Sequence, residues 1–148
     1  MLAIALIAVL LALAVLHLYW GFGGYWPGHD AASLREMVVG ARGARMYGLG
    51  PSAMVAGALT AAAAVVVVRH SAVMTSGFGW VFTAGYIVLI LVFGLRGLAP
   101  YLTSIFDYSR GTAFFDLNRH IYAPLCLALA VGLVFDYPGG LGNVLRKL

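Results

Sequence analysis

Residues 2–20 read LAIALIAVLLALAVLHLYW, and none of these side chains is charged. A helix needs about 20 mostly apolar residues to cross the ~30 Å hydrocarbon core of a bilayer. Glycines at positions 21, 23 and 24 and a proline at position 27 follow the run, and such residues end helices. The run therefore predicts a transmembrane helix over residues 2–21. We expect it to be retained rather than cleaved as a signal peptide, because no basic residue precedes this long apolar stretch.

Three further apolar runs predict helices over residues 51–69, 77–96 and 117–136. Pro51 suits a first helical turn, whereas Pro124 lies inside the last run and should disturb the hydrogen bonding of the turn before it, at the carbonyl of His120. The predicted fold class is an all-α integral membrane protein, a bundle of four transmembrane helices. We expect one membrane domain over residues 1–148, with long polar connections at 22–50 and 97–116.

Composition agrees with a membrane protein and narrows the function. The 148 residues are 63% hydrophobic and 9% charged, whereas a soluble domain is roughly 45–50% apolar and about 25% charged. Cys126 is the only cysteine, so the chain can form neither an internal disulfide nor a cysteine cage for a metal. The net charge of +4 comes from basic residues scattered singly between apolar runs. This pattern favours membrane flanks over a nucleic-acid surface.

Two shorter patterns concern local structure. Residues 31–39 predict a short helix at the membrane interface, started by Asp30 or Ser33 and stopped by a glycine, with Leu34, Met37 and Val38 as its apolar face. Small residues let membrane helices approach closely. The spaced pairs Gly57 with Ala61 and Gly94 with Gly97 therefore predict helix contacts.

Basic residues are unevenly divided between the two ends of the predicted bundle. With four spans, the two long connections share one side of the membrane, and both termini share the other with the short connection. The first side holds Arg35, Arg42, Arg45, Arg96, Arg110 and Arg119, and the second holds Arg69, Arg146 and Lys147. The positive-inside rule then places the long connections in the cytoplasm and both termini outside.

Polar side chains also gather at the end of the long connections, where three spans present them at similar depth. We predict that these side chains converge in one pocket: His17, Trp20, Arg96, Asp116, Arg119 and Tyr122. His17, Asp116 and Tyr122 are the candidate catalytic acid–base groups. Trp20, Arg96 and Arg119 are the candidate ligand-binding groups, with Asp116 offsetting the arginine charge, and no metal site is predicted. The alternative is that the arginines snorkel, the aromatic residues form an interfacial belt and Asp116 caps a helix.

Several short motifs carry a family resemblance. They are HLYWGFGG at 17–24, RG at 96–97, RGT at 110–112, FD at 115–116 and YAPLC at 122–126. In their order and spacing the chain resembles a bacterial family of four-span membrane proteins, the domain of unknown function 3995. The resemblance implies the fold and carries no reaction. Ala123 departs from the serine expected at that position, which weakens any case for a hydroxyl group there.

The sequence leaves three functions open. The first is binding or conversion of a hydrophobic or amphipathic small molecule in an intramembrane pocket near one interface. The second is a haem or metal redox carrier using His17 and His120, and the third is an accessory subunit of a larger membrane complex. Neither the cofactor nor enzymatic activity is decided. The expected location is a multi-pass protein in a bacterial inner membrane, with the lipid bilayer as partner and no nucleic acid, alone, as a homo-oligomer or in a larger complex.

Overall fold

A computed structural model describes residues 1–40, 48–71 and 79–137 and contains helices but no β-strand in these ranges. In chain order the elements are α1 (Leu2–Gly21), α2 (Ala31–Val38), α3 (Leu49–Arg69), α4 (Gly79–Leu102), the 3-10 turn η2 (Asp107–Ser109), α5 (Ala113–Leu117), the π-helical segment η3 (Asn118–Tyr122) and α6 (Ala123–Asp136). Since α5, η3 and α6 run on without a break, the described residues hold four helices long and apolar enough to span a membrane. The predicted all-α, four-span fold is confirmed, and the chain is a multi-pass membrane protein.

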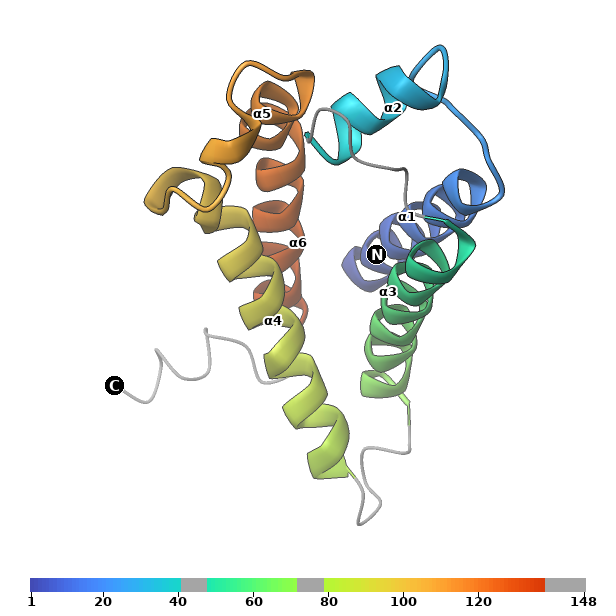
Figure 1. Cartoon of the computed structure of the whole chain (residues 1–148). Helices are drawn as coiled ribbons and strands as arrows, with labels where there is room; N and C mark the ends of the chain where they lie inside the picture. Colours follow the sequence, from blue (N-terminus) through green and yellow to red (C-terminus); the bar gives the residue numbers. More distant parts are fainter. Residues whose placement is uncertain (41–47, 72–78, 138–148) are drawn as a thin grey trace.

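The four spans are arranged as two pairs. α1 packs along α3, and α4 packs along α6; smaller contacts of α3 with α4 and of α1 with α6 join the pairs. Figure 1 shows the pairs diverging toward the end that carries α2 and α5. The core between them includes Leu10, Val66, Tyr86 and Leu133, all fully buried. Large apolar side chains cover the outside of the spans, as expected where lipid is the solvent.

Glycines set the closest helix approaches. A side chain at Gly97 would lie 2.7 Å from Leu127, so the glycine lets α4 meet α6, and one at Gly132 would lie 2.9 Å from Leu6 of α1. Gly97 therefore serves the contact predicted for it. Gly57 does not, because no described atom lies within 4 Å of a side chain built there. The predicted contact at Gly57 is wrong, since that face of α3 points away from the other helices.

Two helices begin or end outside their predicted limits. α4 continues past residue 96 to Leu102 even though it contains Pro100, and the residues just before Gly79 lie outside the described ranges. The last span begins at Ala113 rather than 117, with Thr112 rather than Asp116 as its N-cap. The predicted polar connection 97–116 therefore shrinks to residues 103–112. Proline can stay inside a membrane helix when neighbouring groups satisfy the backbone atom it frees, and Pro100 is a buried residue of α4.

The turn before Pro124 is irregular, as the sequence predicts. Here the helix widens into η3, and the N–H of Ala123 bonds to the carbonyl of Asn118, five residues back. Proline has no N–H to donate, so a change in the bonding pattern at this turn accommodates it. Single π-helical turns of this kind often mark functional sites.

The predicted interfacial helix is α2, and Asp30 is its cap. The Asp30 carboxylate accepts a hydrogen bond from the N–H of Ser33 at 2.8 Å, and the Ser33 hydroxyl accepts one from the N–H of Asp30 at 3.0 Å. Leu34 is fully buried on the face that packs on α5. α2 therefore lies across the open end of the bundle, above the last span (Figure 1).

Candidate binding site

His17 and Trp20 are held by α1 and the turn that follows it. His17 is half-buried, and its Nδ1 donates to the carbonyl of Leu13 at 2.8 Å, while its ring meets the Trp20 ring at 5.1 Å between centroids. Trp20 Nε1 donates to the carbonyl of Trp26 at 2.7 Å. These contacts hold both side chains at the end of α1 and do not bring either of them to Arg96.

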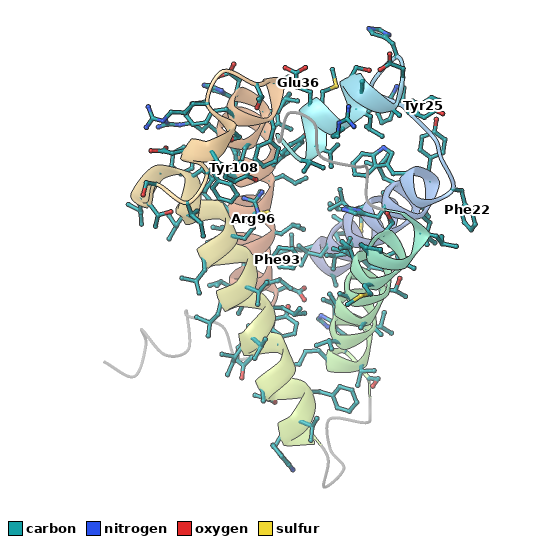
Figure 2. All side chains as sticks on the ribbon, viewed as in Figure 1. Phe22, Tyr25, Glu36, Phe93, Arg96 and Tyr108 are labelled. Atoms are coloured by element: carbon teal, nitrogen blue, oxygen red, sulfur yellow. The ribbon has the colours of Figure 1, made fainter. Side chains whose placement is uncertain are left out.

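Arg96 occupies an inner position near the end of α4 and contacts the π-helical segment. Its Nη2 donates to Oδ1 of Asn118 at 2.8 Å, and its guanidinium lies 4.9 Å from the centroid of the Phe106 ring. Within the described part of the chain, the buried Nη1 has no hydrogen-bond partner. Figure 2 shows Arg96 toward the end of the bundle that carries α2. The site therefore includes Asn118, which is 1% exposed and which is not among the predicted site residues.

Arg119 lies further out, over aromatic rings. Its guanidinium is 5.7 Å from the centroids of both Tyr101 and Phe115, and the Tyr101 hydroxyl donates to the backbone carbonyl of Arg119. The predicted pairing with Asp116 is wrong: among the described residues this exposed carboxylate makes no ion pair. The aromatic rings hold the Arg119 guanidinium instead.

Tyr122 connects the last span to α2. Its hydroxyl donates to the carbonyl of Met37 at 3.1 Å, and its ring packs against Phe114 at 6.1 Å between centroids. This long-range bond, together with the burial of Leu34, fixes α2 over the end of the bundle. The structure thus gives Tyr122 a positioning contact, and its catalytic role stays a prediction.

A polar pocket of about 300 Å³ opens where α4 ends and η3 begins. It is lined by Pro100, Tyr101, Leu102, Thr103, Ser104, Phe106, Asp107, Arg110, Phe115, Asn118 and Arg119. Asp107 neutralises Arg110 at 3.0 Å, whereas Arg119 has no carboxylate partner in the described ranges. Because Oδ1 of Asn118 accepts from Arg96, the amide nitrogen is the donor that Asn118 has left to offer. The pocket therefore combines a net positive charge with neutral donors.

An apolar groove of about 580 Å³ runs along the outer seam between α4 and α6. It is lined by Ile90, Leu91, Gly94, Leu95, Leu98, Ala130, Val131, Val134 and Phe135. On α4, Leu91, Leu95, Leu98 and Leu102 recur at helical spacing, and Leu102 also lines the polar pocket. One face of α4 thus carries the groove and, at its end, the pocket. An elongated molecule could contact both.

Comparison with known proteins now gives the family. The model of a family described as "Protein of unknown function (DUF3995)" matches residues 10–133, which include all residues lining the pocket and all those lining the groove except Val134 and Phe135. The chain belongs to the DUF3995 family. A search of curated proteins and a search of solved structures each found no match. The description of the DUF3995 family assigns no reaction.

The six residues predicted to share one pocket are divided in this DUF3995 protein. Only Arg119 lines the polar pocket; Arg96 lies behind two of its lining residues, Asn118 and Phe106. The prediction of a single six-residue pocket is wrong because α1, which carries His17, packs on α3 rather than on α4. Equal depth in the membrane does not decide which helices are neighbours.

Proposed function

We propose that this DUF3995 protein binds a membrane amphiphile at the seam of α4 and α6, with an anionic head group in the polar pocket and an acyl chain in the groove. The observation that carries the proposal is the continuity of the two along one face of α4, from Leu91 to Leu102. The anionic group is a phosphate or a carboxylate. The sequence predicts only an amphipathic small molecule. The proposal adds the charge of its head group and the place of its acyl chain.

The head-group assignment rests on charge and geometry. Arg119 brings a guanidinium whose charge no carboxylate in the described ranges offsets, and Arg110 adds a second guanidinium paired with Asp107. Guanidinium groups bind phosphate and carboxylate through two parallel hydrogen bonds. The Asn118 amide, held by Arg96, supplies a neutral donor at the back of the pocket. An anion here would therefore meet donors from three residues of the lining.

The groove contributes shape rather than driving force. Lipid tails are as apolar as the groove, so an acyl chain gains little by leaving the bilayer for it. Any surrounding lipid can fill such a groove, and selectivity must come from the head group. Selective binding of anionic lipid therefore tests the proposal better than lipid binding as such.

The test compares two lipids that differ only in the head group. Purified protein in nanodiscs is titrated with phosphatidylglycerol and with phosphatidylcholine of the same chains, and bound lipid is counted by native mass spectrometry. Wild type should prefer the anionic lipid. Arg119→Gln should lower that preference about tenfold or more, since hydrogen bonds to charged groups contribute about 1.5–3 kcal/mol.

Arg35→Gln is the matched control, because it removes the same charge from α2, outside the pocket lining. It should leave the preference unchanged. Equal binding of both lipids by wild type would contradict the proposal. So would an equal loss in both variants, which would point to a general effect of net charge.

The proposal ends at binding. His17, Asp116 and Tyr122 are not among the residues lining the pocket, so no acid–base group is assigned to a reaction there. The redox-carrier and accessory-subunit alternatives stay predictions, because no contact of the described residues favours either. We infer a bacterial inner membrane as the location from the family resemblance and from the four spans.

A further inference from the structure

A second polar cluster lies at the opposite end of the bundle, where α3 and α6 end. Asp136 is the last residue of α6, and its side chain is only 7% exposed. Its Oδ2 accepts two hydrogen bonds of 2.8 Å, from the hydroxyl of Tyr86 on α4 and from Nε2 of His70, the residue that caps α3. One carboxylate oxygen therefore connects three helices, and the sequence pattern had indicated none of this.

The three residues differ sharply in their access to water. Tyr86 is fully buried in the core, Asp136 is nearly buried, and the His70 side chain is 42% exposed. A proton arriving from water reaches His70 first. Histidine changes charge between about pH 5 and 8, so His70 meets the buried carboxylate either as a neutral donor or as a cation.

Among the described residues packed around Asp136, the other charged or titratable side chains outside the cluster are those of Arg69 and Tyr137. From α3, Arg69 donates to Thr83 of α4 at 3.2 Å and lies 4.6 Å from the ring of Tyr137, which follows α6. Arginine and tyrosine keep their charge states near neutral pH. α1 meets α6 near this end through apolar side chains such as Leu6 against Gly132. Within the described ranges, His70 is thus the group through which pH can act on the cluster.

We propose that His70, Asp136 and Tyr86 form a proton-binding site that joins the two helix pairs. With His70 protonated, an ion pair of low exposure links the end of α3 to the end of α6. When His70 loses its proton, a hydrogen bond from a neutral imidazole to the carboxylate is left and the link weakens. The site lies where α3 also contacts α4, at the end from which the pairs diverge in Figure 1. Loss of the proton should therefore loosen the association of the two pairs.

The test measures the distance between the pairs as pH changes. Spin labels are placed at Val67→Cys on α3 and Val131→Cys on α6, two positions each 51% exposed, in a Cys126→Ala background. Pulsed electron resonance on the protein in nanodiscs should give a narrow distribution at pH 5.5. At pH 8.5 the distribution should be broader and its mean longer.

Three variants decide whether His70 is responsible. His70→Gln keeps an amide donor but cannot be charged, so its distribution should resemble that of wild type at pH 8.5 at both pH values. Tyr86→Phe keeps the pair of His70 and Asp136 and should keep the pH response. His29→Gln is the matched control, since His29 is an exposed histidine before α2.

A wild-type distribution that does not change with pH would overturn the proposal. A full response in His70→Gln would do the same. If His70→Gln does not fold, judged by circular dichroism and size-exclusion chromatography, Asp136→Asn takes its place. That variant keeps an oxygen for Tyr86 but no charge for His70, and it should likewise lose the response.

Discussion

Arg96 and Arg119 are residues of one type at one end of the bundle, yet their surroundings differ. Arg96 is drawn inward by the amide of Asn118, whereas Arg119 lies over the rings of Tyr101 and Phe115 near the surface. Snorkelling describes Arg119 in part, because its charge stays near the surface. It does not describe Arg96, whose Nη1 is buried. The partner thus decides which role an arginine at a span end can take.

Asp30 provides a prediction about pH. Its pKa is lowered, first by the hydrogen bond from the Ser33 N–H and then by the Ser33 hydroxyl. A lowered pKa means that the capping contribution is present above the ordinary value of 3.8 and is lost as pH falls through the lowered one. We expect amide exchange in α2 to stay slow at pH 4 in wild type. Asp30→Ala should exchange faster than wild type at pH values above the lowered pKa, whereas in Asp30→Asn, which keeps the acceptor, the amides should stay protected and the degree of protection should not change with pH.

The candidate site could be predicted from sequence only in part. A lone charged residue near the end of an apolar run is costly unless it is paired, so the sequence drew attention to Arg96 and Arg119, and the structure places Arg119 in the lining of the polar pocket. It did not predict Asn118 as the partner of Arg96, because the inward position of Asn118 depends on the π-helical turn. Nor did it predict the cluster of His70 and Asp136, which are 66 residues apart in the chain.

At the scale of single elements, the two prolines inside spans had different consequences. Pro124 is preceded by a widened turn, which the sequence predicted as a local irregularity. Pro100 lies in the last turns of α4, and the helix continues to Leu102. The predicted end at residue 96 was wrong because a charged residue was taken as the limit of the span. The limit of a helix depends on its backbone bonds, and Nη2 of Arg96 donates to a side chain from another element.

Two glycines allow a matched test of helix packing. Gly97→Ala should destabilise the protein by about 1–3 kcal/mol, because the new methyl group would lie 2.7 Å from Leu127 and 3.0 Å from the carbonyl of Ala123. Gly57→Ala meets no described atom within 4 Å, and it should be neutral or stabilise by up to about 1 kcal/mol. Unfolding in mixed micelles with increasing dodecyl sulfate measures both. Equal effects of the two substitutions would show that the contact with α6 does not set the cost of a side chain at Gly97.

At the scale of the whole molecule, hydropathy predicted the number of spans but not their neighbours. The bilayer requires every span to be long and apolar, so each leaves a strong signal in the sequence. Between helices there is no hydrophobic force, and contacts depend on small residues and shape. Gly57 and Gly97 look alike in sequence, but only Gly97 lies at a contact. The pairing of α1 with α3, which separates His17 from Arg96, therefore required the structure.

The orientation of the bundle in the membrane follows from its charge. α2 and the connection 103–112 lie at one end, with Arg35 and Arg110, whereas Arg69 lies at the other (Figure 1). Basic residues near span ends favour the cytoplasm. We therefore expect the end with the polar pocket to face the cytoplasm, and the cluster of His70 and Asp136 to face the outside.

Cysteine labelling in intact cells tests this orientation. In a Cys126→Ala background, a membrane-impermeant maleimide should label Ser71→Cys in intact cells. It should label His29→Cys and Ser104→Cys, two exposed positions at the α2 end, only after the cells are made permeable. The reverse pattern would place the pocket outside, where its arginines would oppose the positive-inside rule. Binding of the ligand would then be the reason for arginines at that end. It would also expose the cluster of His70 and Asp136 to the pH of the cytoplasm rather than to the external pH.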